Sequence, residues 1–261
     1  MITSFKNSRI KLVRDLLAAK KNRESESLMV LEGVRLAEEA VNKGIPISMC
    51  FFSENLTERG HATLAQITKI TDVVEELPQP LMDRLSDTQH AQGILLVCSL
   101  PDLPFPASPT LLIALDRIND PGNMGTILRT SAALQVDGVL LTPGTTDPYS
   151  PKALRAAMGA QLHLPIQWQE AEMIQPFCKS AEIPLALVTT LMDCPQACWD
   201  ADLAQPLCLV IGNEANGISD TLLSQSDACV RIPIADDTES FNAAIAAAII
   251  MYEVRRQRNM P

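Results

Sequence analysis

The chain has 261 residues, which suits two domains or one large one, and a composition of 47% hydrophobic and 20% charged residues argues against extensive disorder. The net charge of -10 argues against bulk, non-specific nucleic-acid binding, and no apolar run reaches the length of a membrane span. The seven cysteines, an odd number spread along the chain, are typical of reduced thiols in a cytosolic protein.

Positive charge is concentrated at the start of the chain. Residues 1–23 hold seven basic residues and one acidic residue, a local charge of +6, whereas the remainder carries -16. Lys6, Arg9, Lys11 and Arg14 belong to this basic arm, which can contact RNA phosphates. A solvated helix face explains the same charges equally well. The segment lacks the apolar core and cleavage site of a secretory signal, so we interpret it as mature protein.

Strand and helix patterns alternate in the first hundred residues, which predicts a small layered α/β domain. The expected strands are 28–31, 47–52, 71–74 and 94–98, and the expected helices are 33–42 and a stretch around 61–67. Residues 99–109 (SLPDLPFPASP) then contain four prolines, too many for a helix or central strand. We therefore predict a first domain at 1–98, a linker at 99–109 and a second domain at 110–261.

The second domain opens with a predicted βαβ unit. Residues 111–115 form a buried strand that ends at Asp116, residues 119–123 form a turn, and 138–141 form a second strand. Asn123 is predicted to be the N-cap of the intervening helix. Arg129 is unusual in that otherwise apolar helix, although it can be a surface arginine paired with a carboxylate. Such units place functional groups where strand meets helix.

Further along, a turn-rich loop leads to a helix with Pro151 at its first position, in which Lys152 and Arg155 face the same side. They can bind RNA phosphates or be ordinary surface charges. Strands are expected at 184–190 and 207–212, and Gly212 would let a ligand approach the backbone. Glu214 can be a helix-capping acid. The chain contains no GxGxxG sequence, so an ordinary Rossmann cofactor site has no support.

The C-terminal residues predict a strand at 230–234, a turn at 236–237, and a helix capped by Ser240 that runs to about Arg256. This helix is rich in Ala and Ile on nearly every face, so it must be buried in the core or in a subunit interface. Cys194 and Cys198 have three residues between them, but no second pair of ligands follows nearby, and we expect no metal site.

Three strings resemble, in order and spacing, the motifs of the SpoU family of RNA 2'-O-ribose methyltransferases, within the SPOUT superfamily: NDPGNMGTILRTS, IGNEANGIS and RIPIADDTESFNAAIAAAIIMYEVRRQ. DPYSPKALRAAMGA is similar to SpoU sequences as well. LMVLEGVRLAEEAVNKG and LSDTQHAQGILLV resemble the L30e-like substrate-binding domain that precedes many SpoU catalytic domains. The resemblance implies an L30e-like α/β domain followed by a SPOUT α/β methyltransferase domain with a deep trefoil knot. Pattern rules alone favour an open doubly wound sheet, since threaded chains are rare.

The resemblance also implies an S-adenosylmethionine-dependent enzyme that methylates a ribose 2'-hydroxyl of structured RNA, rRNA ahead of tRNA, as a cytoplasmic homodimer. The positions that match the family's cofactor contacts are Gly212, Ile232, Phe241, Thr189 and Ile234. The positions that match its catalytic residues are Arg129, Asn123, Glu214, Ser240 and Asn242. The family's usual S-L-N-V-S becomes S-F-N-A-A here, with Ala244 in place of the second serine.

In the family, the arginine that matches Arg129 activates the hydroxyl. A guanidinium is a poor base, so we expect Arg129 to bind the adjacent phosphate and polarise the hydroxyl while water takes the proton. Two other functions stay open: a SPOUT enzyme that methylates a base nitrogen, and a non-catalytic RNA-binding protein that kept the fold.

Overall fold

The computed structural model describes the chain except for residues 1, 3, 87–91, 236–239 and 259–261. Its described residues form two compact α/β units. The first comprises residues 1–102 and 147–163, and the second comprises residues 103–146 and 164–261. The turn predicted at 236–237 lies outside the described residues.

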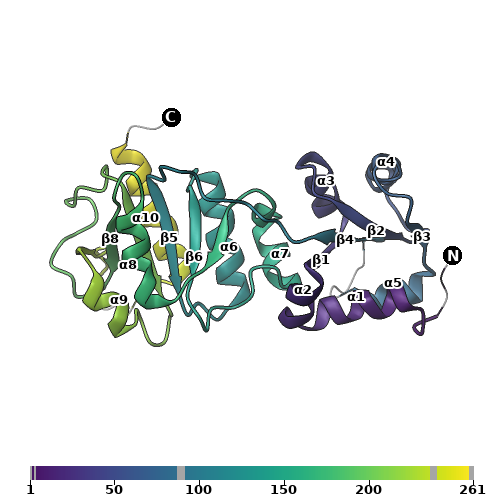
Figure 1. The fold of residues 1–261 in the computed structure, drawn as a ribbon, viewed down its shortest axis with the longest axis horizontal. Coiled ribbons are helices and arrows are strands. Elements are labelled where there is room, and N and C mark those ends of the chain that lie inside the picture. The colour runs from purple at the N-terminus through teal and green to yellow at the C-terminus, as the bar shows by residue number, and fades with distance from the viewer. Residues whose placement is uncertain (1, 3, 87–91, 236–239, 259–261) are drawn as a thin grey trace. The chain divides into compact units, whose positions relative to one another are not determined.

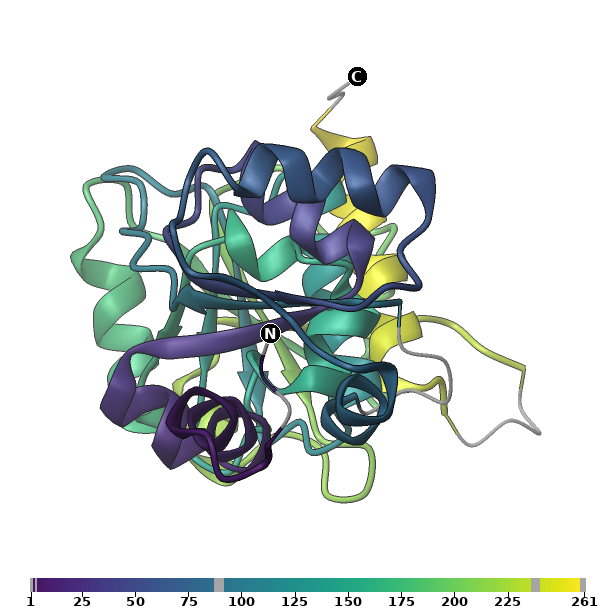
Figure 2. The same ribbon diagram turned by 90° about the vertical axis from the view of Figure 1, so that its right-hand side faces the viewer.

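The first unit is a four-stranded sheet between two layers of helices (Figure 2). The strand order is β1-β4-β2-β3, in which β4 is antiparallel to both of its neighbours and β2 is parallel to β3. The strands are β1 (Leu28–Glu32), β2 (Ile47–Phe52), β3 (Val74–Glu76) and β4 (Ile94–Ser99). The helices are α1 (Ser8–Ala18), α2 (Lys20–Glu26), α3 (Val34–Asn42), α4 (Glu58–Ile67) and α5 (Gln79–Leu85).

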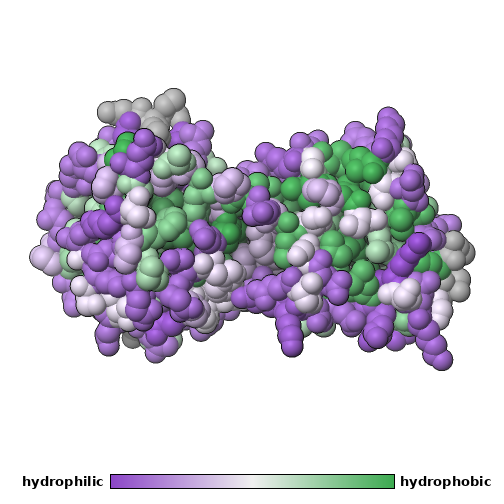
Figure 3. Space-filling view, in the orientation of Figure 1, coloured by the Kyte–Doolittle hydropathy of each residue, from purple (hydrophilic) through white to green (hydrophobic). Residues whose placement is uncertain are grey.

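Alternating apolar residues build a core on each face of this sheet, because successive side chains of a strand point to opposite faces. In β1, Met29 and Leu31 join the core under α3 and α4, while Val30 joins the core that α1 and α5 cover. Helix α1 contributes Ile10 and Val13 to that second core. The outer side of α1 is hydrophilic, which the lower edge of this unit shows in Figure 3.

Helix α7 (Pro151–Ala157) and the short 3-10 helix η1 (Ala160–Leu162) belong to the first unit, although the sequence places them in the second predicted domain. Leu154 and Leu162 are almost fully buried in the core beneath α3. The buried Arg23 also donates hydrogen bonds to Asp147, at 2.5 and 2.8 Å. The division between units therefore differs from a single break at the linker, because apolar contacts bring residues 147–163 back to the N-terminal core.

The second unit contains an entirely parallel six-stranded sheet in the order β10-β8-β9-β5-β6-β7 (Figure 1). The chain forms β5, β6 and β7 outward in sequence, and it later inserts β9 between β5 and β8. The strands are β5 (Leu111–Asp116), β6 (Gly138–Leu141), β7 (Ile166–Trp168), β8 (Ala186–Thr190), β9 (Leu207–Gly212) and β10 (Ala228–Val230). The helices are α6 (Pro121–Ala133), α8 (Ala171–Ser180), α9 (Asp220–Gln225) and α10 (Ala243–Gln257).

Helices cover both faces of this sheet, as its near-continuous apolar strands require. Helices α8 and α9 pack together on one face, where Leu112 and Val210 join the same core as Ile174 and Leu222. Helices α6 and α10 pack against each other, and Figure 1 places α10 across the sheet from α8. None of the described helices has the length and apolar character needed to cross a membrane.

Cys194 and Cys229 form a disulfide bond, so the expectation that all cysteines are reduced thiols is wrong for these two. Cys229 lies in β10 beside Thr189 of β8, and the chain after β8 brings Cys194 back with its Cα 6.0 Å from that of Cys229. This is a usual Cα separation for a disulfide. Their 35-residue separation in sequence concealed the pairing, because only the contact of β8 with β10 makes them neighbours.

The position of α7 predicts how a truncated protein will behave. A fragment of residues 103–261 exposes Leu154 and Leu162, which the N-terminal core buries in the full chain. We expect this fragment to aggregate, and we expect the same fragment with Leu154→Gln and Leu162→Gln to elute as one species in size-exclusion chromatography with light scattering. A monodisperse unsubstituted fragment would contradict the assignment of α7 to the first unit.

Candidate active site

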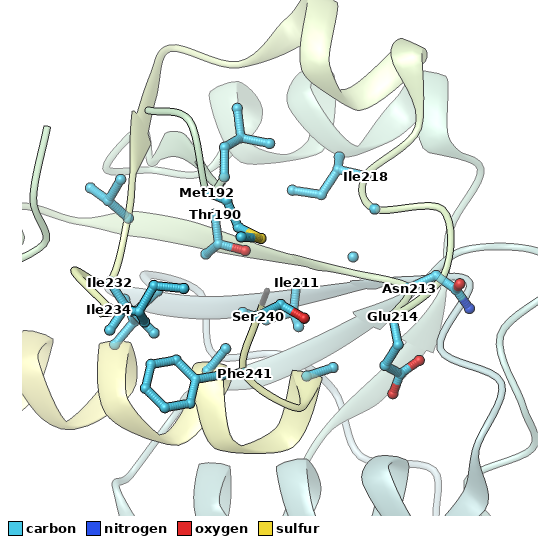
Figure 4. Close-up of a pocket in the computed structure, with 17 residues that line it drawn as sticks. Thr190, Met192, Ile211, Asn213, Glu214, Ile218, Ile232, Ile234, Ser240 and Phe241 are labelled. Atoms are coloured by element: carbon cyan, nitrogen blue, oxygen red, sulfur yellow. The ribbon is translucent and has the colours of Figure 1, made fainter. Parts of the chain in front are cut away.

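The loops after β8 and β9 and the segment before α10 enclose a cavity of about 320 Å³ (Figure 4). That volume falls in the range of small-molecule sites. Six residues predicted from the sequence line it. Four are from the predicted cofactor set, Gly212, Ile232, Ile234 and Phe241, and two are from the predicted catalytic set, Glu214 and Ser240. The carboxyl ends of adjacent parallel strands meet at one edge, and there the fold brings these distant motifs together.

The wall of the cavity is mostly apolar. Phe241 lies beside Ile232 and Ile234 on one side, and Met192 lies on another side in Figure 4. Ile232 and Ile234 were expected in a strand at 230–234, but the strand ends at Val230 and both residues belong to the following loop. A few polar groups interrupt this lining, including Thr190, Ser240 and Glu214.

Gly212 is required by the protein's own backbone. A Cβ there would lie 2.5 Å from the carbonyl carbon of Gly217 and 2.6 Å from the amide nitrogen of Ile218, because the loop turns back directly over it. Asn213 and Gly217 exchange two backbone hydrogen bonds that fix this return. The sequence suggested a glycine that admits a ligand; the structure shows a close approach between two parts of the chain.

A chain of side-chain hydrogen bonds joins all three predicted motifs. The amide of Asn242 donates to Oδ1 of Asn123 at 2.9 Å, and Nδ2 of Asn123 donates to Oε1 of Glu214. Asn123 is thus the centre of the network, with one neighbour from the β9 loop and one from the start of α10. Glu214 acts as a hydrogen-bond acceptor for Asn123, which accounts for a carboxylate at this place.

The helix caps differ from those predicted. Asp120, not Asn123, is the N-cap of α6, and its Oδ1 accepts from the Asn123 backbone N–H at 2.8 Å. Pro121 occupies the first helical position, where its missing N–H costs nothing. Likewise Asn242, not Ser240, caps α10, and its Oδ1 accepts from the backbone N–H groups of residues 244 and 245. The side chains of Asn123 and Ser240, which were predicted to be caps, therefore do not cap these helices and can take part in the site.

Thr189 does not line the cavity. Its side chain is buried and bonded to Ser226 and Ala228, because adjacent residues of a strand face opposite sides, and Thr190 faces the cavity instead. Ala244 also lies away from the cavity lining and is buried, so the serine missing from the family pattern leaves that lining unchanged.

Arg129 is exposed on α6 and does not line the cavity. Within the described part of the chain its side chain has no ion pair or hydrogen bond, so the predicted alternative of a surface arginine paired with a carboxylate has no support there. Its guanidinium is available to a ligand that approaches from outside.

The predicted RNA-contacting residues have different environments. Lys6, Lys11 and Arg14 are exposed, whereas Arg9 pairs with Glu75 at 2.6 Å. Lys152 is exposed on α7. Arg155, in contrast, is half-buried, with Nη1 3.5 Å from Oε2 of Glu32. Arg23, which contributes to the positive charge of the N-terminal arm, is buried and is not a surface group.

Sequence reasoning missed several lining residues, most of which are apolar or glycine and carry no chemical signal. They are Thr190, Leu191, Met192, Ile211, Asn213, Gly217, Ile218, Val230, Ala243, Ala246 and Ile250. Thr190, Leu191 and Met192 directly follow a predicted strand that was expected to end beside a ligand loop. That position was the only signal available for them.

Known proteins resemble the chain over both units. Residues 110–252 match the model of the SpoU rRNA Methylase family, and residues 7–96 match that of the MRM3-like substrate binding domain. The 23S rRNA (guanosine(2553)-2'-O)-methyltransferase RlmP of Bacillus subtilis is 28% identical over 97% of this chain and 98% of its own. The 23S rRNA (uridine(2479)-2'-O)-methyltransferase of Streptomyces viridochromogenes is 30% identical over 98% and 92%.

A solved structure also resembles the chain over nearly its whole length. The SpoU methyltransferase AviRb from Streptomyces viridochromogenes, in complex with the cofactor AdoMet, superposes with a TM-score of 0.88 at 27% identity, over 98% of this chain and 99% of that one. The likeness therefore covers residues of both units.

The revised cap of α10 makes a prediction about stability. Asn242→Ala removes the acceptor for two backbone N–H groups and should lower the free energy of unfolding by about 1 kcal/mol. Ser240→Ala serves as the control and should change it by less than about 0.5 kcal/mol, since Ser240 caps none of the described helices. Urea denaturation of both variants checks this, and a larger loss for Ser240→Ala would restore the cap predicted from the sequence.

Proposed function

Since the chain belongs to the SpoU rRNA methylase family, we propose that it transfers a methyl group from S-adenosylmethionine to a ribose 2'-hydroxyl of ribosomal RNA. The observation that carries the proposal is the hydrogen-bonded chain from Asn242 through Asn123 to Glu214, because Glu214 lines the cavity and the other two residues hold it from outside the lining. Ribosomal RNA is favoured over tRNA because the relatives named above are 23S rRNA 2'-O-methyltransferases.

The cavity has a lining that fits the proposed cofactor. Apolar side chains such as Phe241 and Ile232 suit an adenine ring, and the turn after Gly212 supplies backbone polar groups. Gly212, Ile232, Ile234 and Phe241 would hold the cofactor, with Thr190 replacing Thr189 in that role. When bound, S-adenosylmethionine supplies an electrophilic methyl group on a sulfonium sulfur.

The residues of the chain then orient the ribose. Asn123, Glu214, Ser240 and Asn242 form a polar rim whose relative positions are fixed by the hydrogen bonds among three of them. Holding the hydroxyl in line with the reactive group accounts for much of the rate in such reactions. Arg129 would bind the adjacent phosphate and polarise the hydroxyl, while water takes the proton, since arginine side chains remain protonated in proteins.

The first unit would bind the RNA outside the target nucleotide. Its match to a substrate-binding domain supports this role, as do the exposed Lys6, Lys11 and Arg14 on and before α1. Lys152 is exposed on α7 and would add a further positive charge to this surface. Arg9 would contribute less, because it forms a close ion pair with Glu75 at 2.6 Å. Arg155 would contribute less, because its side chain is only 28% exposed.

A homodimer formed through α10 is part of the proposal. One stripe of this helix, including Ala244, Ala247 and Met251, is buried within the unit. On another stripe, Ile245 and Tyr252 stay 48% and 64% exposed, and a second copy of the same helix would remove this apolar surface from water.

Two further parts of the proposal come from elsewhere. The trefoil knot is a prediction from the family, and a cytoplasmic location is proposed because the proposed substrate is rRNA.

The proposal is tested by mass spectrometry of rRNA and tRNA nucleosides from a strain that lacks the gene. We expect one 2'-O-methyl group to be missing from rRNA, and nuclease mapping should locate it on a ribose. A missing base methyl group would support the base-methylating alternative. An unchanged set of modifications, together with no cofactor binding in calorimetry, would support a non-catalytic RNA-binding protein.

Arg129→Ala should abolish methyl transfer and leave the affinity for S-adenosylmethionine unchanged, because Arg129 does not line the cavity. Arg129→Lys should also fail, since lysine lacks the planar fork that grips a phosphate. Methyl incorporation from labelled cofactor measures the first effect, and calorimetry measures the second. If the alanine variant turns over within about threefold of wild type, the assignment of Arg129 is wrong. Such a change is well below the tenfold that about 1.4 kcal/mol represents.

Ile245→Glu should convert the proposed dimer to a monomer or make it insoluble, since it places an unpaired charge in the interface. Glu253→Ala is the matched control, because Glu253 lies on the same helix and pairs with Arg256 within it. Light scattering at micromolar concentration measures both. A wild-type protein that is already a monomer would refute the proposed dimer.

A further inference from the structure

The catalytic unit is strongly acidic, which is a difficulty for a protein that must bind RNA. Residues 103–146 and 164–261 contain seven lysines and arginines against sixteen aspartates and glutamates. A polyanion is repelled by such a unit unless positive charge lies where its phosphates approach. RNA binding by this unit therefore depends on which of its seven basic residues can reach a phosphate.

Four of the seven are engaged in bonds within the unit. Their partners are Asp227 for Lys179, Glu253 for Arg256, Gln135 for Arg255, and the carbonyl groups of Thr110 and Gln205 for Arg258. The other three are Arg117, Arg129 and Arg231. Among the described residues, the guanidinium of none of these three has a hydrogen-bond or ion-pair partner nearer than 3.4 Å.

Arg117 is the one of these three that the backbone holds in an unusual conformation. It follows β5 directly and has a φ of 56°, in the left-handed region that arginine rarely adopts. Two side chains hold it there: its N–H donates to Oγ1 of Thr142 at 3.1 Å, and its carbonyl accepts from Nδ2 of Asn213 at 2.8 Å. The surrounding structure thus maintains this strained backbone conformation.

The guanidinium of Arg117 retains unused donors. Its Nη2 is 3.4 Å from Oδ2 of Asp116, and that buried carboxylate already accepts from Thr142 at 2.9 Å and from the Ser219 backbone at 2.7 Å. Nε of Arg117 is buried and has no hydrogen-bond partner in the described structure. The side chain is nevertheless 39% exposed, so its outer nitrogens reach solvent.

We infer that Arg117 is a phosphate-binding residue that positions the substrate RNA strand beside the target ribose. The inference rests on the proposed function. Arg117 lies three residues before Asp120, the cap of the helix that carries Asn123 and Arg129, and Asn213 ties its backbone to the cavity loop. A phosphate held there is fixed to the same edge of the sheet as the polar rim. Arg231 follows the edge strand β10, three strands away from β5.

Because Arg117 has a left-handed backbone conformation, its side chain can be removed without an expected loss of stability. Arg117→Gly removes the guanidinium and relieves the strain, so its melting temperature should equal or exceed that of wild type. Its KM for rRNA purified from the deletion strain should rise about tenfold, with kcat and the dissociation constant of S-adenosylmethionine within threefold of wild type. The slope of log affinity for that rRNA against log salt should fall by about one.

Two variants serve as comparisons. Arg117→Lys keeps the charge and should keep the salt slope. Ser27→Gly relieves the same kind of strain at a φ of 53° where α2 ends, and it should leave both KM and the salt slope unchanged. If Arg117→Gly proves unstable, Arg117→Asn, which tolerates the left-handed region, replaces it.

The outcome separates this inference from the proposed function. Wild-type rRNA affinity and salt slope in Arg117→Gly would overturn the inference and leave the methyltransferase proposal intact. A wild-type protein that methylates no rRNA would defeat the proposed function, while the salt dependence of RNA binding would still test Arg117.

Discussion

The side-chain amide of Asn213 is the interaction on which the candidate site most depends. Its Nδ2 donates to the carbonyl of Arg117, and its Oδ1 accepts from the backbone N–H groups of Ala215 and Asn216 at 2.8 and 3.1 Å. One nearly buried amide thereby joins the loop after β5 to the loop after β9. Aspartate cannot donate to the Arg117 carbonyl, and an apolar residue would leave three backbone groups without this partner.

The arrangement around Asn213 explains how a site made from loops can be precise. Loops are usually mobile, but here Gly212 and Gly217 lie in contact, and Asn123 connects Glu214 to the cap of α10. The parallel strands β5 and β9 hold the bases of these loops at a fixed separation. Catalysis by orientation requires such rigidity, because a small displacement of the ribose would cost much of the rate.

The charges of the molecule are divided in a way that suits a specific RNA-binding enzyme. Residues 1–23 carry excess positive charge, whereas the unit that contains the cavity is acidic. General attraction to RNA is therefore weak near the cavity, and under the proposed function RNA binding there would depend on a few arginines. This distribution favours an RNA whose shape matches both units over any RNA that merely presents phosphates.

The apolar strands were the most predictable part of the fold. Residues 47–52, 138–141 and 207–212 were predicted as strands with the observed bounds, because a short apolar run between turn residues has few other structures. The short elements β7, α8 and α9 were missed, and strand β3 was placed three residues too early. In these segments the local pattern is weak, and contacts with the rest of the sheet decide the conformation.

Within the site, the sequence by itself determined which residue types are present: the asparagines and glutamate of the motifs, and an arginine in an apolar helix. Only the tertiary structure decided their roles. Asp120 and Asn242 cap the helices, so the side chains of Asn123 and Ser240 are not used as caps. Thr190 rather than Thr189 faces the cavity. The physical reason is that successive side chains of a strand point to opposite faces, and that only one residue at a helix start can be the N-cap. A shift of one residue in the position of an element therefore changes which side chain faces the cavity or caps the helix. Likewise, contacts between residues far apart in sequence placed α7 with the N-terminal core and paired Cys194 with Cys229.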